Sequence, residues 1–230
     1  MTGYSQTSSG QVSSSAQRGA TLRSWRSSRA WFILIVSILL SLAVDLVSKD
    51  LAFRYVGPQP VVISREKVLE IHRTGDPRNI QSLVPRHNER VIIPYLLHFT
   101  LVLNPGAVFG MGPGQRAFFI AFTVGALAFS IYAFGSWTRP KDIGAHVAIG
   151  ILIGGGLGNL FDRLVYACVR DFIHPLPGWT WPGGLKPFGE TAVWPYVSNV
   201  ADLFLLVGIA MLLMYLWRRD RGDQKASRAG

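Results

Sequence analysis

Four long apolar segments constrain the fold of this chain more than any other feature of its sequence. They cover residues 31–51, 116–137, 143–166 and 196–217, and each has about the 20 residues that an α-helix needs to cross a bilayer. Hydrophobic residues make up 49% of the chain and charged residues only 16%, which is a low charge for a soluble domain of this length. The sequence therefore predicts an all-α membrane bundle of four transmembrane helices.

The first apolar segment has two interpretations. Ser41-Leu42-Ala43 resembles the small-residue cleavage site of a signal peptide. We prefer a retained helix that ends in the sequence DLVSKDL. There Asp45 and Lys49 are four residues apart and would meet on one helical face, where an intrahelical ion pair explains both of them.

Polar stretches divide the rest of the chain. Residues 1–30 are rich in Ser, Gly, Gln and Arg, which predicts a disordered cytoplasmic tail. The membrane domain is predicted to cover residues 31–217, with extramembrane inserts at 57–98 and 173–195. A basic cytoplasmic tail at 218–230 completes the predicted organisation.

Local patterns add two predictions about packing. Short runs with β-branched residues at 61–64, 68–72 and 99–104 predict a small sheet outside the membrane. In the third apolar segment glycines recur every four residues, which leaves one helical face as bare backbone and allows a neighbouring helix to approach closely. These glycines are Gly150, Gly154 and Gly158.

The distribution of basic residues predicts the orientation in the membrane. Four spans place both termini on one side, where the two tails and the 139–142 loop carry eleven Lys and Arg residues. The stretches 57–98 and 167–195 carry eight, so the termini are predicted to be cytoplasmic and the inserts to face outward. The net charge of +10 is not organised with aromatics into a nucleic-acid motif, so no nucleic-acid partner is expected.

Ionisable residues gather where the third and fourth segments approach the outer surface. Such groups are costly near hydrocarbon, so they are usually paired, hydrated or functional. Asp162 can pair with Arg163 or with an Arg on another helix, whereas Asp171 and Asp202 lack an equally clear structural need. The predicted topology brings one set of polar residues together: Asn159, Asp162, Arg163, Asp171, Asn199 and Asp202.

Two neighbouring carboxyl groups predict acid–base chemistry without identifying the reaction. They cannot both ionise easily, so one keeps a proton and can act as an acid while the other acts as a base. This is the logic of an aspartic protease. A small proton-coupled transporter would also bury carboxyl groups, and a structural membrane subunit would pair all of them internally.

Metal and thiol chemistry are not indicated by the sequence. The five histidines show no ligand spacing, so neither a metal nor a cofactor is expected. Cys168 is the only cysteine, which excludes an internal disulfide, and no histidine is placed to activate it. We interpret Cys168 as a packing residue.

Four motifs, in order, resemble those of lipoprotein signal peptidase, also called signal peptidase II. They are DLVSK (45–49), NPGAVFG (104–110), GNLFDRLVYACVRDF (158–172) and SNVAD (198–202), and the resemblance covers about residues 31–217. It implies four membrane helices with a small extracytoplasmic β-cradle. It also implies a bacterial inner-membrane aspartyl endopeptidase, expected as a monomer among membrane lipids, that cleaves lipid-modified prolipoproteins before a diacylglyceryl-modified cysteine.

The resemblance assigns roles to individual residues. Asp171 and Asp202 match the catalytic pair. Asp45, Lys49 and Asp162 match polar residues with a structural role. The residues expected to lie beside the substrate are Asn104, Gly106, Phe109, Asn159, Arg163 and Asn199.

Within that set, Arg163 is expected to hold the substrate backbone. Two features depart from the family pattern: Ser198 replaces the usual Phe, and the inserts at 57–98 and 173–195 are long.

Overall fold

The computed structural model describes residues 23–106 and 116–229. Within them, four helices are long and apolar enough to cross a membrane, which confirms the predicted bundle. These helices are α1 (Ser28–Tyr55), α3 (Arg116–Trp137), α4 (Ile143–Val165) and α5 (Val200–Ala229).

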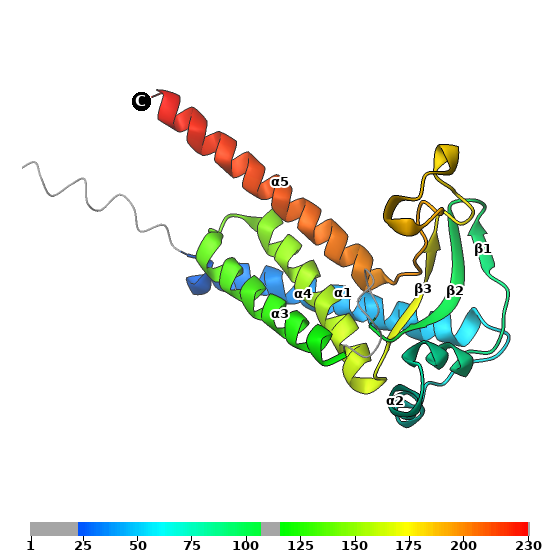
Figure 1. Ribbon diagram of the computed structural model, residues 1–230. Helices are drawn as coiled ribbons and strands as arrows, with labels where there is room; N and C mark the ends of the chain where they lie inside the picture. The colour runs from blue at the N-terminus through cyan, green and yellow to red at the C-terminus, as the bar shows by residue number, and fades with distance from the viewer. Residues whose placement is uncertain (1–22, 107–115, 230) are drawn as a thin grey trace, which may run out of the picture.

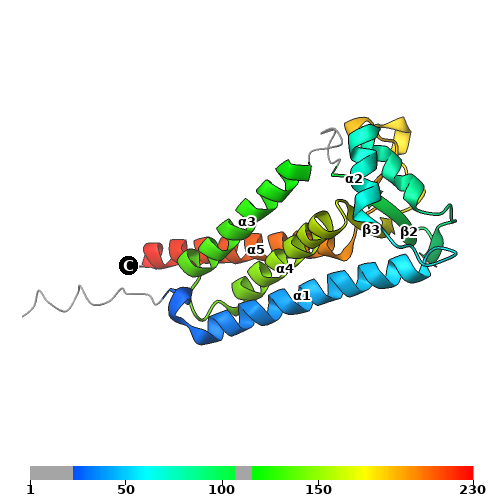
Figure 2. The same ribbon diagram turned by 90° about the horizontal axis from the view of Figure 1, so that it is seen from below.

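Helix α4 lies at the centre, with α1, α3 and α5 packed around it (Figures 1 and 2). Its apolar window is 61% buried, against 22% or less in the other three helices. The outer helices therefore present most of their apolar surface outward, as expected of helices that face lipid.

The predicted glycine face of α4 packs against α1. A Cβ atom at any of the three positions would collide with α1, so only glycine allows this approach. The contacts join Gly150 to Ser37, Gly154 to Ser41, and Gly158 to the carboxyl group of Asp45. This close packing fixes the separation of the two helices that carry Asp45, Lys49, Asn159 and Asp162.

A small antiparallel sheet covers one end of the bundle (Figure 1). Its strands are β1 (Arg90–Ile93), β2 (Leu97–Asn104) and β3 (Val169–Pro175), in the order β1-β2-β3. Phe53 of α1 joins Leu101, Leu103 and Phe172 in the apolar core beneath the sheet. This core anchors β3, and with it Asp171, against the end of α1.

Only one of the three predicted β-runs is a strand. Residues 99–104 belong to β2, but 61–64 form no strand and 68–72 lie in helix α2 (Arg65–Thr74). The side chain of Ser64 accepts a hydrogen bond from the backbone N–H of Lys67 and so caps α2, which overrides the β-like alternation that follows. The sequence analysis also missed β1 and β3.

Both predicted tails contain regular structure where they are described. A short 3-10 helix covers Ser24–Arg26, and α1 already begins at Ser28, capped by the side chain of Ser27. The remaining predicted disorder, at residues 1–22, lies outside the described residues. At the other end α5 continues to Ala229, through the stretch that we expected to be a polar tail.

The inserts are folded against the sheet end of the molecule. The first contains α2 and the 3-10 helix η2 (Pro77–Leu83), and the second contains η3 (Pro182–Gly184) and η4 (Pro187–Gly189). Backbone hydrogen bonds from Trp181 to Thr191 and from Val193 to Trp179 close the second insert into a hairpin-like loop.

Candidate active site

The polar centre lies where the sheet meets the bundle. Asp171 comes from β3, and Asp202 comes from the first turn of α5. Asn199 contacts both carboxyl groups: its Nδ2 donates to Asp171 Oδ1 at 2.6 Å, and its backbone N–H donates to Asp202 Oδ2 at 3.1 Å. The structure thus brings the two carboxyl groups onto one asparagine.

The beginning of α5 explains the position of Asp202. Asn199 precedes the helix and accepts from the Asp202 backbone N–H at 3.2 Å, while its own N–H donates to the Asp202 carboxyl group. This reciprocal pair is a capping box built from Asn and Asp. The next free donor, the N–H of Ala201, is satisfied from α1 by Asp45 Oδ1 at 2.8 Å.

Lys49 and Asn159 form the buried support beneath the pair. Lys49 donates to Asn159 Oδ1 at 3.0 Å, and Asn159 Nδ2 donates to Asp202 Oδ1 at 2.8 Å. Lys49 also pairs with Asp45 at 2.8 Å and lies 3.5 Å from Asp162, and all three charged side chains are fully buried. The expected intrahelical ion pair is therefore present, but it belongs to a network that joins α1 to α4.

Asp162 pairs with Arg170, and neither of the partners considered from the sequence is used. Arg170 Nη2 lies 2.8 Å from Asp162 Oδ1, and the Arg170 backbone N–H donates to Asp162 Oδ2 at 3.0 Å. The Arg170 guanidinium also lies 4.4 Å from the centroid of the Tyr166 ring. Asp162 thus ties α4 to the strand residue that directly precedes Asp171.

Arg163 lies beside the carboxyl pair and has one hydrogen-bond donor that no described residue accepts. Its Nη1 donates to the backbone oxygen of Asn159 at 3.2 Å, and its guanidinium lies 5.3 Å from the ring centroid of Phe119. Its Nε is buried and has no hydrogen-bond partner among the described residues. Arg116, which sequence reasoning missed, donates to the backbone oxygen of Arg163 at 3.0 Å.

Asn104 and Gly106 approach the pair from the end of β2. Asn104 Nδ2 donates to Asp171 Oδ2 at 3.1 Å, and its Oδ1 accepts from the Gly106 N–H at 2.9 Å. Gly106 has φ +98°, and a Cβ there would lie 3.0 Å from the Phe119 ring, so both backbone and space favour glycine. Phe109, the third residue of this motif, lies outside the described residues.

The pKa values of Asp171 and Cys168 show which of the two can exchange a proton near neutral pH. Burial, together with the adjacent charge of Asp202, raises the pKa of Asp171 to about 7, although Asn199, Asn104 and Lys49 oppose the shift. Burial also raises the pKa of the Cys168 thiol to about 12, which leaves almost no thiolate at neutral pH. The carboxyl pair, and not the thiol, is therefore suited to proton transfer near pH 7.

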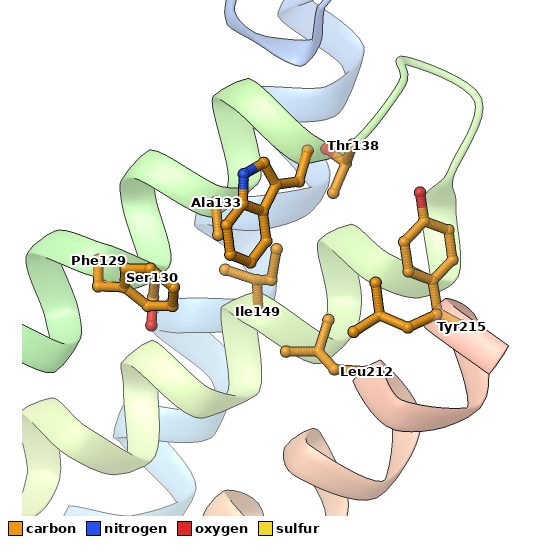
Figure 3. A pocket seen from close by; sticks show the side chains of 9 residues that line it. Phe129, Ser130, Ala133, Thr138, Ile149, Leu212 and Tyr215 are labelled. Carbon is orange, nitrogen blue, oxygen red and sulfur yellow. The ribbon is translucent and has the colours of Figure 1, made fainter. Parts of the chain in front are cut away.

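Two apolar cavities lie at different distances from this centre. One, of about 480 Å³, is bounded by α1, the sheet and the first residue of α5, with Phe172 and Val200 in its wall. The other, of about 90 Å³, lies between α3, α4 and α5 and is lined by Phe129, Leu212 and Tyr215 (Figure 3). Phe172 and Val200 are the chain neighbours of Asp171 and Asn199, and no such neighbour lines the smaller cavity, so of these two cavities the larger one adjoins the candidate active site.

The fold and the site define a class before any relative is considered. Four apolar helices carry, at one end, a pair of carboxyl groups held by asparagines, and one of these groups has a pKa near neutrality. This combination is that of a membrane enzyme of the aspartic type.

Comparison with known proteins identifies the family. The model of signal peptidase (SPase) II matches residues 36–218. The chain belongs to the signal peptidase II family and is an aspartic endopeptidase.

Named relatives agree with this assignment, and a solved structure shares the fold. The lipoprotein signal peptidase of Desulfitobacterium hafniense (strain DSM 10664 / DCB-2) is 34% identical over 134 residues, which are 58% of this chain and 78% of that protein. That of Halothermothrix orenii is 35% identical over 133 residues, 57% of this chain and 79% of that protein. A bacterial membrane enzyme solved at 2.3 Å shares the fold with a TM-score of 0.54 and 24% identity, over 80% of this chain and 87% of that one.

Proposed function

We propose that this protein is an intramembrane aspartyl endopeptidase that removes the signal peptide from diacylglyceryl-modified prolipoproteins, with Asp171 and Asp202 as its catalytic pair. One observation carries the proposal: Asn199 holds both carboxyl groups, and the buried one has a pKa of about 7. Membership of the signal peptidase II family supports cleavage of lipoprotein signal peptides.

The reaction needs one ionised and one protonated carboxyl group. The ionised group removes a proton from water as the water oxygen attacks the scissile carbonyl carbon. The protonated group stabilises the developing oxyanion, and a proton then reaches the leaving nitrogen. A pair with one pKa near 7 supplies both forms at neutral pH.

Residues around the pair would position the peptide. Arg163 has a buried Nε without a partner among the described residues, and we assign it to a carbonyl oxygen of the substrate backbone. Gly106 has no side chain, so only its backbone occupies the space beside Asn104. Asn104, Asn159 and Asn199 hold the carboxyl oxygens in place and border the same space.

The larger apolar cavity would receive the lipid-modified part of the substrate. It holds about 480 Å³ and is walled by apolar side chains of α1 and the sheet, which suits acyl chains. Its walls include Phe172 and Val200, the neighbours of Asp171 and Asn199 in the chain. Acyl chains bound there would place the adjoining peptide bond near the carboxyl pair.

The proposed orientation puts the termini in the cytoplasm and the active site toward the outer leaflet. The first described residues and the end of α5 both lie at the end of the bundle opposite the sheet (Figures 1 and 2). The excess of basic residues in the tails and the 139–142 loop supports a cytoplasmic location for that end.

The proposed function is tested with purified protein in proteoliposomes and a diacylglyceryl-modified prolipoprotein. Asp171→Asn and Asp202→Asn should each lower cleavage at least a thousandfold while leaving the helical content unchanged. The matched control is Asp50→Asn, which makes the same change at a half-exposed carboxyl group paired with Arg54. Wild-type cleavage by either catalytic variant, or proton flux without cleavage by the unmodified protein, would exclude the proposed function.

A further inference from the structure

Groups that can only donate hydrogen bonds fix the orientation of the amides around the two carboxyl groups. The ammonium group of Lys49 can only donate, so the Asn159 atom that faces it at 3.0 Å is the amide oxygen. The Asn159 nitrogen must then face Asp202, to which it donates at 2.8 Å. Lys49 therefore determines which end of the Asn159 amide reaches Asp202.

The orientation of Asn199 is fixed in the same way. Its Oδ1 accepts from the backbone N–H of Asp202 at 3.2 Å, and a backbone N–H is also only a donor. Its Nδ2 therefore points away and donates to both Asn159 Oδ1 at 3.1 Å and Asp171 Oδ1 at 2.6 Å. Because Asn159 presents its oxygen to both Lys49 and Asn199, reversing the Asn159 amide would disrupt the contact between the two asparagines.

The two carboxyl groups consequently have different surroundings. Asp202 accepts from Asn159 and from the Asn199 N–H at the N-terminal end of α5, where the helix dipole stabilises a negative charge. Asp171 lies on a strand, is 2% exposed, and among the described residues accepts side-chain hydrogen bonds from the neutral amides of Asn199 and Asn104. The helix end favours the anion at Asp202, while burial disfavours it at Asp171.

The charged groups in and around the carboxyl pair are consistent with one proton retained by the pair. Three cations and four carboxyl groups interact within the cluster, so a single shared proton makes it neutral. The cations are Lys49, Arg163 and Arg170, and the carboxyl groups are those of Asp45, Asp162, Asp171 and Asp202.

We propose that Lys49 is a positioning residue: by fixing the Asn159 amide so that its nitrogen donates to Asp202, it leaves Asp202 as the base and the proton of the pair on Asp171. This inference rests on the proposed function of the pair. The pKa of about 7 that burial and Asp202 give to Asp171 is consistent with a proton held there at neutral pH.

The assignment gives each proton a defined path. In the attack step, water transfers a proton to Asp202 while its oxygen bonds to the carbonyl carbon, and Asp171 transfers its proton to the carbonyl oxygen. In the second step, Asp202 transfers its proton to the amide nitrogen as the C–N bond breaks. One hydroxyl group of the gem-diol returns its proton to Asp171, which restores the starting state.

The role of Lys49 is tested by the pH profile of kcat/KM, which reports the groups of the free enzyme. Lys49→Met removes the donor that fixes the Asn159 amide, so the proton should no longer be confined to Asp171, and a further Asn104→Ala change should not move the alkaline limb. The value of kcat should also fall at least tenfold. Lys49→Arg keeps the charge and should retain the wild-type limb with partial activity. A merely structural lysine would lower activity and leave the shift caused by Asn104→Ala intact.

The location of the proton is tested by Asn104→Ala, because Asn104 contacts Asp171 and not Asp202. Losing this donor disfavours the anion of Asp171, so the alkaline limb should move upward while the acid limb stays in place. Where a variant has weak activity, infrared titration of the protonated carboxyl band in the substrate-free protein measures the same pKa shift.

The possible results separate this inference from the proposed function. A shift by Asn104→Ala that persists in Lys49→Met, or a shift confined to the acid limb in Asn104→Ala alone, would overturn the inference and leave the pair as the catalytic centre. Full cleavage by Asp171→Asn or Asp202→Asn would overturn the proposed function instead. If Lys49→Met fails to fold, Asn104→Ala still decides where the proton lies.

Discussion

Gly155 determines how closely the helix that carries Asp202 approaches α4. A Cβ atom at this position would lie 2.8 Å from the backbone oxygen of Ala201 and 3.3 Å from the Cβ of Phe204. Ordinary contacts begin near 3.4 Å, so in Gly155→Ala the first turn of α5 must move away by about 0.6 Å. Asp202 lies in that turn and Asn199 directly precedes it, so the displacement falls directly on the proposed catalytic pair.

The expected result is a loss of activity that exceeds the loss of stability. Overpacking costs about 1–3 kcal/mol, whereas replacing a helical glycine by alanine returns about 1 kcal/mol. Thermal unfolding in detergent should therefore change little or fall slightly. A displacement of this size at reacting groups should lower kcat by about 10–100-fold, since about 1 Å of misplacement can cost 100-fold.

A second glycine of α4 provides the matched control. Nothing lies within 4 Å of the position that a Cβ would occupy at Gly144. Gly144→Ala should raise the unfolding temperature slightly and leave kcat for the lipidated substrate unchanged. Equal kcat in Gly155→Ala and the wild type would refute the argument that this contact sets the position of Asp202.

Three further predictions follow from the site. The value of kcat/KM should fall as pH rises through about 7, because Asp171 then loses the proton that the proposed mechanism needs; a profile flat to pH 9 would contradict this. Arg170→Met leaves the buried Asp162 without its closest cation, so chemical denaturation should show a loss of about 3–5 kcal/mol, and a loss below 1 kcal/mol would contradict a structural role. Cys168→Ala should retain cleavage within about threefold in the proteoliposome assay, because a thiol with a pKa of about 12 supplies no nucleophile; abolished cleavage in a folded variant would contradict this.

The membrane helices could be predicted because long apolar runs leave few other structures. The predicted bounds of the second span, 116–137, coincide with α3. The fourth span was predicted to begin at Tyr196, but α5 begins at Val200. The apolar residues Tyr196 and Val197 extended the predicted span, although the polar Ser198 and Asn199 separate them from the helix. The spacing of Asn199 and Asp202 carries the signal of a capping box, and it would have placed the helix start correctly.

The sheet and the ion-pair partners were harder to predict. Strand β3 contains Arg170 and Asp171 side by side, so its sequence lacks the alternation of polar and apolar residues that indicates a strand. The partner of Asp162 depends on the turn between α4 and β3, which brings Arg170 back to it. Sequence order could gather the charged residues at one end of the bundle, but only the path of this turn decides which of them pair.

The hydrogen bond from Ala201 to Asp45 joins the earliest membrane helix to the start of the latest one. During synthesis, α1 carries Asp45 into the membrane before the ribosome has made Ala201, its hydrogen-bond partner. The proposed catalytic centre therefore cannot assemble before α5 has been made, and proteolytic activity should arise only when this helix enters the bilayer. We therefore expect the nascent chain to have no peptidase activity until α5 has been inserted.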